Sequence, residues 1–269
     1  MRILLIVLMA LAGSAAAHAA CPDLPGAEAL FASSKPRIVW VGEMHGTAEE
    51  PALFGDLVCI AGRTGRKVVV TLERTEAEQA DWDAFLAGGD RARLTAGQSW
   101  HWSMQDGRSS EAMVALAERL RAFKTEGWLA AVRMMQREGG ARSIANYKLD
   151  NETSMAEAVQ SAARDYPDAL ILAYSGGLHA RKTMSPIDKD LPLAASQLPR
   201  GEVASVDVEG LSGTAWTCLA DGCGVHSFGE RDHHARGVVM GAPEEGFDAA
   251  AYTGLPYTAS PPAVTPRDK

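Results

Sequence analysis

The chain has 269 residues, of which 46% are hydrophobic and 22% charged, and its formal net charge is −8 at pH 7. This composition excludes a mainly disordered chain, and the length allows one sizeable hydrophobic core. The acidic balance argues against nucleic acid or an anionic membrane as a partner, because both carry negative charge themselves.

The first twenty residues have the composition of a secretory signal. Arg2 gives a positive start, residues 3–11 are apolar, and small residues ending in Ala17-His18-Ala19 precede the expected cleavage site. The apolar stretch is too short to cross a bilayer, which takes about 20 residues, and no later stretch reaches that length. We therefore expect residues 1–20 to be a cleaved signal peptide. We expect the mature protein to be soluble, periplasmic or secreted, and without a transmembrane segment.

The cysteines Cys21, Cys59, Cys218 and Cys223 are an even number in a chain expected to be exported, which favours disulfides over thiol chemistry. Cys218 and Cys223 are close enough in sequence to close a short loop, which leaves Cys21 to pair with Cys59. A lipid anchor on Cys21 is the alternative, although the leucine that lipoprotein signals usually carry three residues upstream is absent. No C-x-x-C pair indicates a zinc site.

The first predicted unit is a strand, a helix and a second strand. Residues 37–41 are a short β-branched run that predicts a buried strand. Apolar residues then recur at helical spacing from Leu53 to Ile60, and residues 67–72 predict the second strand. This order, with a crossover of about thirty residues, predicts that the two strands are parallel.

The same order continues along the chain. Helices are expected at residues 75–87, 110–125 and 154–166, and strands at 128–134 and 169–174. Residues 201–208 and 214–218 are expected to add one or two strands, antiparallel at the sheet edge. Together these elements predict an α/β fold with a central, mostly parallel sheet flanked by helices. We expect one domain over residues 21–241 and a Pro-rich, partly disordered tail over 242–269.

Residues 90–109 show no clear period and contain Trp100, His101 and Trp102. We expect a long loop or helical insertion over one end of the sheet. Two tryptophans around a histidine suit stacking on a flat cofactor or ligand such as a porphyrin or a sugar. The alternative is that this aromatic cluster packs as a lid or as part of the core.

Polar residues follow three predicted strands where each strand ends. The motif G-x-x-H occurs twice, ending in His45 after the first strand and in His179 after the strand 169–174, and Glu73 follows the second strand. Carboxyl ends of strands line the binding crevice in open α/β sheets. One G-x-x-H alone is typical of an ordinary turn, but two motifs joined by Glu73 indicate a site. Glu43, inside the first motif, either belongs to that site or forms a salt bridge elsewhere.

Two kinds of chemistry suit His45, Glu73, His179 and Glu43. A histidine can remove a proton from water while a carboxylate orients its other ring nitrogen, which makes all four candidate catalytic residues. Alternatively, His45, His179 and Glu73 can ligate zinc, manganese or iron, and the bound water becomes the nucleophile.

The stretch Asp232-His233-His234 matches the D-H-H motif of a phosphoesterase family. That family also needs aspartates at earlier strand ends, where this chain has Glu43 and Glu73. We therefore interpret the stretch as a solvated turn, with accessory metal binding as the alternative.

Four stretches carry a resemblance to a known superfamily: VGEMHGTAEEP, VVVTLER, NETSMAEAV and LILAYSGGLHARK. They resemble the superfamily of erythromycin-esterase-like hydrolases, ChaN-like haem-uptake proteins and the TraB, PrgY and Tiki proteins. The shared pattern is G-E-x-H-G-x-x-E after the first strand, a glutamate ending the second and a later G-x-x-H. The resemblance covers residues 36–182 and implies an α/β fold with a site at His45, Glu73 and His179, beside Glu43.

The resemblance implies several activities. Tiki-like members are associated with metal-dependent peptide cleavage, esterase-like members with water activation against a lactone, and ChaN-like members bind haem. Many relatives carry R-D-x-x-M-A where this chain has Asn151 to Ala156, so an arginine that would pair with a carboxylate or oxyanion is missing. Arg181 and Lys182 are the expected substitutes.

These observations lead to two hypotheses. The first is an exported hydrolase that activates water with His45, Glu73, His179 and Glu43, with or without a divalent metal. Its substrate is a small molecule or peptide with an ester, lactone or peptide carbonyl. The second is a haem- or iron-binding uptake protein in which the loop from Trp100 to Trp102 covers the porphyrin.

Overall fold

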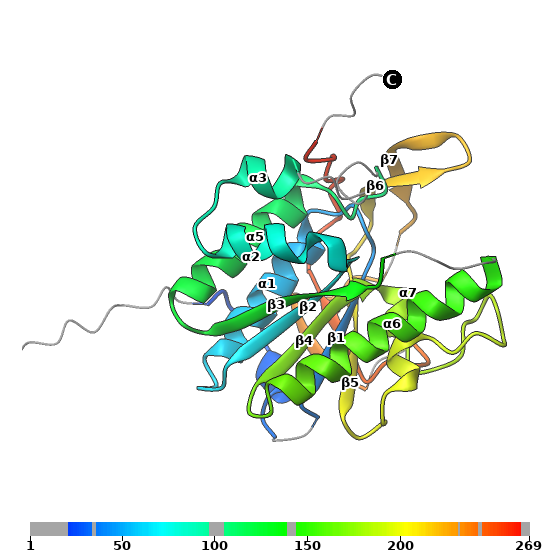
Figure 1. The fold of residues 1–269 in the computed structure, drawn as a ribbon. Helices are drawn as coiled ribbons and strands as arrows, with labels where there is room; N and C mark the ends of the chain where they lie inside the picture. Colours follow the sequence, from blue (N-terminus) through cyan, green and yellow to red (C-terminus); the bar gives the residue numbers. More distant parts are fainter. Residues whose placement is uncertain are drawn as a thin grey trace, which may run out of the picture.

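A seven-stranded sheet forms the centre of the protein in a computed structural model that describes residues 21–33, 36–96, 105–138, 144–230, 232–241 and 244–264 (Figure 1). The strand order is β3-β2-β4-β1-β5-β9-β8, and all neighbours except β8 and β9 are parallel. The predicted α/β fold with a mostly parallel sheet is confirmed. The expected signal peptide and the stretch from Trp100 to Trp102 lie outside the described residues.

The strands are β1 (Ile38–Glu43), β2 (Val68–Thr75), β3 (Leu129–Gln136), β4 (Leu170–Gly176), β5 (Val203–Glu209), β6 (Gly213–Leu219), β7 (Gly222–Phe228), β8 (Gly237–Met240) and β9 (Ala249–Tyr252). The α-helices are α1 (Glu49–Gly62), α2 (Gln79–Leu86), α3 (Arg91–Ala96), α5 (Glu111–Thr125), α6 (Ile144–Asp165) and α7 (Gly177–Ala180). Short 3₁₀ helices are η1 (Ala27–Leu30), η2 (Glu76–Glu78) and η3 (Ala194–Gln197). Among the described residues, no helix is long and apolar enough to cross a membrane.

Helices cover both faces of the sheet, which explains why its central strands are apolar throughout. Successive side chains of a strand point to opposite faces. On β1, Val39 and Val41 pack into the core beneath α1, α2 and α5, whereas Ile38 and Trp40 pack into the core beneath α6. All of β1, β2 and β4 is buried, so these strands are a rigid platform for the residues at their carboxyl ends.

The two strands expected at the sheet edge are present, but their expected pairing was wrong. The strand expected at residues 201–208 is β5, which pairs in parallel with β1 inside the sheet and not antiparallel at its edge. The strand expected at 214–218 is β6, which forms a separate antiparallel hairpin with β7. The antiparallel edge strand is β8, because its pairing with β9 ends the sheet.

The stretch expected as a Pro-rich tail contributes to the fold. Residues 249–252 form β9 between β5 and β8, where small alanine side chains are fully buried. The chain then returns over the carboxyl ends of the strands, where Ala48 N–H donates to Thr258 O at 2.9 Å and Ser260 N–H to Gly46 O at 2.8 Å. The sequence from residue 249 to 264 therefore belongs to the domain, and the boundary expected at 241 is wrong.

Both expected disulfides, Cys21–Cys59 and Cys218–Cys223, are confirmed. The first joins the N-terminal segment to α1 across a separation of 38 residues, whereas the second closes the β6–β7 hairpin across 5. A disulfide stabilises by restricting the unfolded chain, and this gain grows with loop length.

We expect replacement of Cys21 and Cys59 by serine to lower the free energy of unfolding by about 4 kcal/mol, and replacement of Cys218 and Cys223 by about 2 kcal/mol. Urea unfolding of both double variants tests this order. Equal stability of the wild type and the Cys21 and Cys59 variant would contradict it.

Candidate active site

Three neighbouring parallel strands carry the candidate site at their carboxyl ends. Glu43 is the last residue of β1, Glu73 lies near the end of β2, and Gly176 ends β4 directly before the short helix α7 that carries His179. Because β4 lies between β2 and β1, residues from distant parts of the chain meet there. Glu43 and Glu73 are inside their strands and not just after them, so the sheet itself fixes their side chains.

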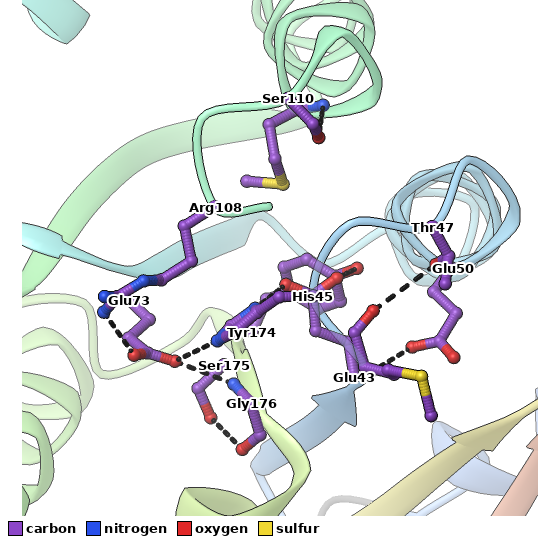
Figure 2. A network of polar contacts seen from close by, with 12 residues as sticks. Glu43, His45, Thr47, Glu50, Glu73, Arg108, Ser110, Tyr174, Ser175 and Gly176 are labelled. Atoms are coloured by element: carbon purple, nitrogen blue, oxygen red, sulfur yellow. Dashed lines mark hydrogen bonds and ion pairs between the residues drawn. The ribbon is translucent and has the colours of Figure 1, made fainter. Parts of the chain in front are cut away.

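His45 is oriented by the carboxylate of Glu43. Its Nδ1 lies 2.7 Å from Glu43 Oε1, and the other oxygen of Glu43 accepts a hydrogen bond from the Tyr174 hydroxyl. Glu43 and Tyr174 are buried, whereas 23% of the His45 side chain is exposed. The imidazole is therefore partly exposed and is held on its Nδ1 side by buried groups (Figure 2).

Glu73 lies between the two histidines. Its Oε2 is 3.4 Å from His45 Nε2 and accepts the Gly176 backbone N–H at 2.7 Å, and its Oε1 is 3.7 Å from His179 Nε2. On the far side of His179, Nδ1 lies 2.6 Å from Glu152 Oε1. The side chains thus alternate as carboxylate and imidazole in the order Glu43, His45, Glu73, His179, Glu152, and we refer to these five as the Glu–His relay.

Arg108 adds a cation to the relay. Its Nη1 donates to Glu73 Oε1 at 3.0 Å (Figure 2). Its Nε donates to Asp106 at 2.9 Å. The Arg108 carbonyl accepts a hydrogen bond from the guanidinium of Arg74 at 2.7 Å. Arg74 is itself buried against Glu78 at 2.5 Å, so a second layer of charge holds the backbone of Arg108 in place.

Charge around the histidines favours their protonated forms. Burial alone would lower the pKa of His45, but the carboxylates of Glu73 and Glu43 outweigh it and raise this pKa to about 10. Burial also opposes protonation of His179, and there Glu73 and Glu152 raise the pKa above its ordinary value. Near neutral pH the relay therefore stores a proton on His45.

The pKa values of two carboxyl groups, Glu73 and Glu50, are shifted in opposite directions. Burial would raise the pKa of Glu73, but His179, His45 and Arg108 hold it well below the usual range, so Glu73 is ionised. Glu50 lies deeper, where burial and the nearby charge of Glu43 raise its pKa well above the usual range. Its Oε2 accepts the Met44 backbone N–H at 2.6 Å, so Glu50 fixes the turn between Glu43 and His45.

The structure brings together all four residues selected from the sequence, Glu43, His45, Glu73 and His179. It adds Glu152 and Arg108, which the sequence analysis did not select. Glu152 is part of the stretch NETSMAEAV, where its place after Asn151 marked only a departure from the family pattern. Arg108 lies in the stretch without periodicity, and no sequence signal connected it with Glu73.

The expected substitutes for the missing arginine lie elsewhere. Arg181 pairs with Glu244, and Lys182 pairs with Asp248. Both side chains therefore tie α7 to the segment before β9. Arg108 is the arginine that contacts the relay, and this expectation for Arg181 and Lys182 is corrected.

A divalent metal fits the relay poorly as it is arranged. His45, His179 and Glu73 are the donors that would hold it, but zinc needs nitrogen and oxygen ligands at roughly 2.0–2.2 Å. Here both oxygens of Glu73 already accept hydrogen bonds, from Gly176 and Arg108, and the Arg108 cation repels a dication. Within the described ranges, no group of three or more His, Cys, Asp or Glu side chains is arranged to hold a metal ion. We derive no step through a metal.

The D-H-H stretch contacts β9 through His234. The His234 ring stacks on Tyr252 of β9, with ring centroids 4.0 Å apart. This packing accounts for His234 without a catalytic role.

Comparison with solved structures places this arrangement among known folds. A protein from Bacillus cereus superposes with a TM-score of 0.62 at 10% identity, covering 84% of this chain and 90% of that one. A mutant of the erythromycin esterase EreC in its open conformation gives 0.60 at 9% identity, covering 83% and 91%. The chain shares its fold with this esterase. A succinoglycan biosynthesis protein gives 0.54 at 9% identity, covering 72% and 71%.

The likeness to EreC and the other two structures is limited to the fold, because identities of 9–10% are too low to transfer the role of any residue. No protein-family profile matches the chain, and no curated protein sequence matches it. Any functional argument therefore has to come from the site.

Proposed function

We propose that this protein is a hydrolase of the erythromycin-esterase-like superfamily that activates water at the Glu–His relay to cleave an ester, lactone or peptide carbonyl. The observation that carries the proposal is the convergence of His45 and His179 on Glu73, at 3.4 Å and 3.7 Å, with a carboxylate behind each ring. A single histidine paired with a single carboxylate would be enough for an ion pair that only stabilises the fold. Five alternating carboxylates and imidazoles go beyond this and suit proton transfer.

Each group has a role in this chemistry. Glu43 and Glu152 hold the Nδ1 side of each ring and direct Nε2 toward Glu73. A water molecule beside His45 Nε2 and Glu73 transfers a proton to Nε2 of neutral His45 as its oxygen attacks the carbonyl carbon. Arg108 and protonated His179 supply positive charge for the oxyanion that develops, and His179 returns a proton to the leaving group.

The stored proton predicts a pH dependence. His45 accepts a proton from water only in its neutral form, and its pKa is raised to about 10. His179 has to stay protonated in the same step, so we expect a bell-shaped dependence of kcat/KM on pH that is displaced to the alkaline side of 6.5, the ordinary value for histidine.

Turnover measurements on the purified protein test the proposal. A panel of uncharged aryl esters, lactones and a peptide library is assayed with the wild type and His45→Ala. Hydrolysis of at least one class, reduced by about 10²-fold or more in the variant, supports the proposal, since general bases contribute roughly 10²–10⁴-fold. Turnover that is equal in both proteins contradicts it.

Haem binding stays the alternative prediction, with Trp100, His101 and Trp102 as the expected stacking residues. Haemin titration separates the two functions. A Soret band that shifts on addition of wild-type protein, and stays unshifted with a Trp100→Ala and Trp102→Ala variant, supports haem binding. An unshifted band with wild-type protein, together with hydrolysis sensitive to His45→Ala, supports the enzyme.

Metal content is a separate prediction. Elemental analysis of the wild type, His45→Ala and His179→Ala decides it. Equal metal content in all three proteins supports a relay without metal, and a loss of metal in both variants assigns a metal to these rings.

The proposed setting is an oxidising compartment outside the cytoplasm, which the two disulfides support.

A further inference from the structure

The β6–β7 hairpin is outside the central sheet (Figure 1) but contacts the two segments that carry His45 and Arg108. On β6, the Trp216 backbone N–H donates to Gly46 O at 2.9 Å, and Gly46 directly follows His45. The indole Nε1–H of the same residue donates to Gln105 O at 2.9 Å. One tryptophan therefore holds two backbone carbonyls that belong to different parts of the site.

The second contact leads to Arg108. Gln105 precedes Asp106, which binds the Arg108 guanidinium, and Arg108 binds Glu73. Cys218, two residues after Trp216, adds to this contact because its Sγ lies 3.2 Å from Gln105 O. Since Cys218 is bonded to Cys223, the disulfide stiffens the part of the hairpin that touches Gln105.

Glycines show how closely the three segments pack. A Cβ atom on Gly46 would lie 2.0 Å from Trp216 O, and one on Gly107 would lie 2.5 Å from Gly46 N. Both glycines also have positive φ, 86° and 90°, which other residues rarely adopt. The backbones of the His45 turn, the Arg108 segment and β6 thus contact each other directly. A shift in the hairpin would therefore displace both His45 and Arg108.

We propose that Trp216 is a positioning residue for the hydrolysis proposed above, acting through Gln105 on Arg108. The inference rests on that function. Among the residues that the structure describes, Trp216 forms no hydrogen bond with a side chain of the relay, so its effect comes from the placement of the Arg108 guanidinium against Glu73. The hairpin, closed by Cys218–Cys223, serves as the rigid support.

The variant Trp216→Phe tests the inference, because it removes the indole N–H and keeps the aromatic ring and the backbone bond to Gly46. We expect kcat to decrease roughly 10- to 100-fold, as small displacements of catalytic groups do, with KM changed less than twofold. The matched control is Trp128→Phe, which removes a tryptophan that stacks on Phe123 next to the start of β3. Its kcat is expected to stay at the wild-type value.

A double variant distinguishes positioning from general destabilisation. If Trp216 acts through Arg108, adding Trp216→Phe to Arg108→Gln causes no further loss of kcat. Multiplied losses in the double variant, or an unchanged kcat in Trp216→Phe alone, would overturn the inference.

A readout without turnover keeps this test separate from the proposed function. The Nε–H of Arg108, assigned from its loss in Arg108→Gln, is observed in ¹H–¹⁵N NMR spectra. We expect its hydrogen exchange to be at least tenfold faster in Trp216→Phe than in the wild type and in Trp128→Phe. Equal exchange in all three proteins overturns the inference, whereas absent turnover with altered exchange overturns only the hydrolase.

Discussion

Replacing Glu73 by glutamine is expected to lower kcat/KM by roughly 10²–10⁴-fold, the range associated with loss of acid–base catalysis. Glutamine has the size and shape of glutamate but no charge. It cannot hold the His45 proton or pair with Arg108 as a carboxylate does. The measurement is steady-state hydrolysis of the substrate class found in the panel, at matched concentrations of folded protein.

The control for this substitution is Glu76→Gln, three residues along the chain. Glu76 contacts the backbone of Glu138, outside the relay, so the same chemical change there should leave kcat/KM close to the wild-type value. Retention of more than a third of wild-type activity by Glu73→Gln would remove the residue from the mechanism.

Replacing Arg74 by methionine is expected to lower the free energy of unfolding by about 3–5 kcal/mol, the usual cost of removing one partner of a buried ion pair. Only 1% of Arg74 is exposed, and its Nε lies 2.5 Å from Glu78, which is also buried. Methionine fills similar space but leaves the Glu78 charge without its cation. Urea unfolding followed by circular dichroism provides the measurement.

A second substitution reveals whether the loss comes from that charge. Adding Glu78→Gln to Arg74→Met should restore part of the lost stability, because the buried carboxylate is then gone. A double variant less stable than Arg74→Met would show that the pair is not the cause. Activity should stay low in both variants, since the Arg108 carbonyl loses its hydrogen bond from Arg74.

The platform of the site could be predicted because its signals are local. Short β-branched runs identified β1 and β2, an apolar run identified β4, and the repeated G-x-x-H identified the ends of β1 and β4. Parallel strands that neighbour each other bring their carboxyl ends together, so His45, Glu73 and His179 could be placed at one rim from sequence alone. The exact strand ends could not, since pairing of Glu43 with Gly176 and of Thr75 with Gln136, both far along the chain, extends the strands past their predicted ends.

The partners of these residues could not be predicted, because their proximity depends on tertiary packing. Glu152 lies on a helix that was expected to begin at residue 154 and begins at Ile144. Arg108 reaches Glu73 from a segment without periodicity, 35 residues away in sequence. Neither residue type nor spacing indicates such contacts.

The C-terminal part was misread for a different reason. Residues 249–251 are alanines, which have low strand propensity and give a weak hydrophobic signal. In the fold they form most of β9 (Ala249–Tyr252). Pairing with β5 and β8, together with full burial, outweighs the low strand propensity of alanine. Small side chains suit this position because the sheet is covered on both faces.

The measurement that tests the central claim most directly is a titration of the His45 imidazole by NMR of ¹⁵N-labelled protein, in the wild type and in Glu73→Gln. The relay predicts a pKa of about 10 for His45 in the wild type. It predicts a lower value in the variant, because the carboxylate charge that favours the cation is gone. A wild-type pKa near 6.5 that is the same in Glu73→Gln would show that His45 and Glu73 do not share a site.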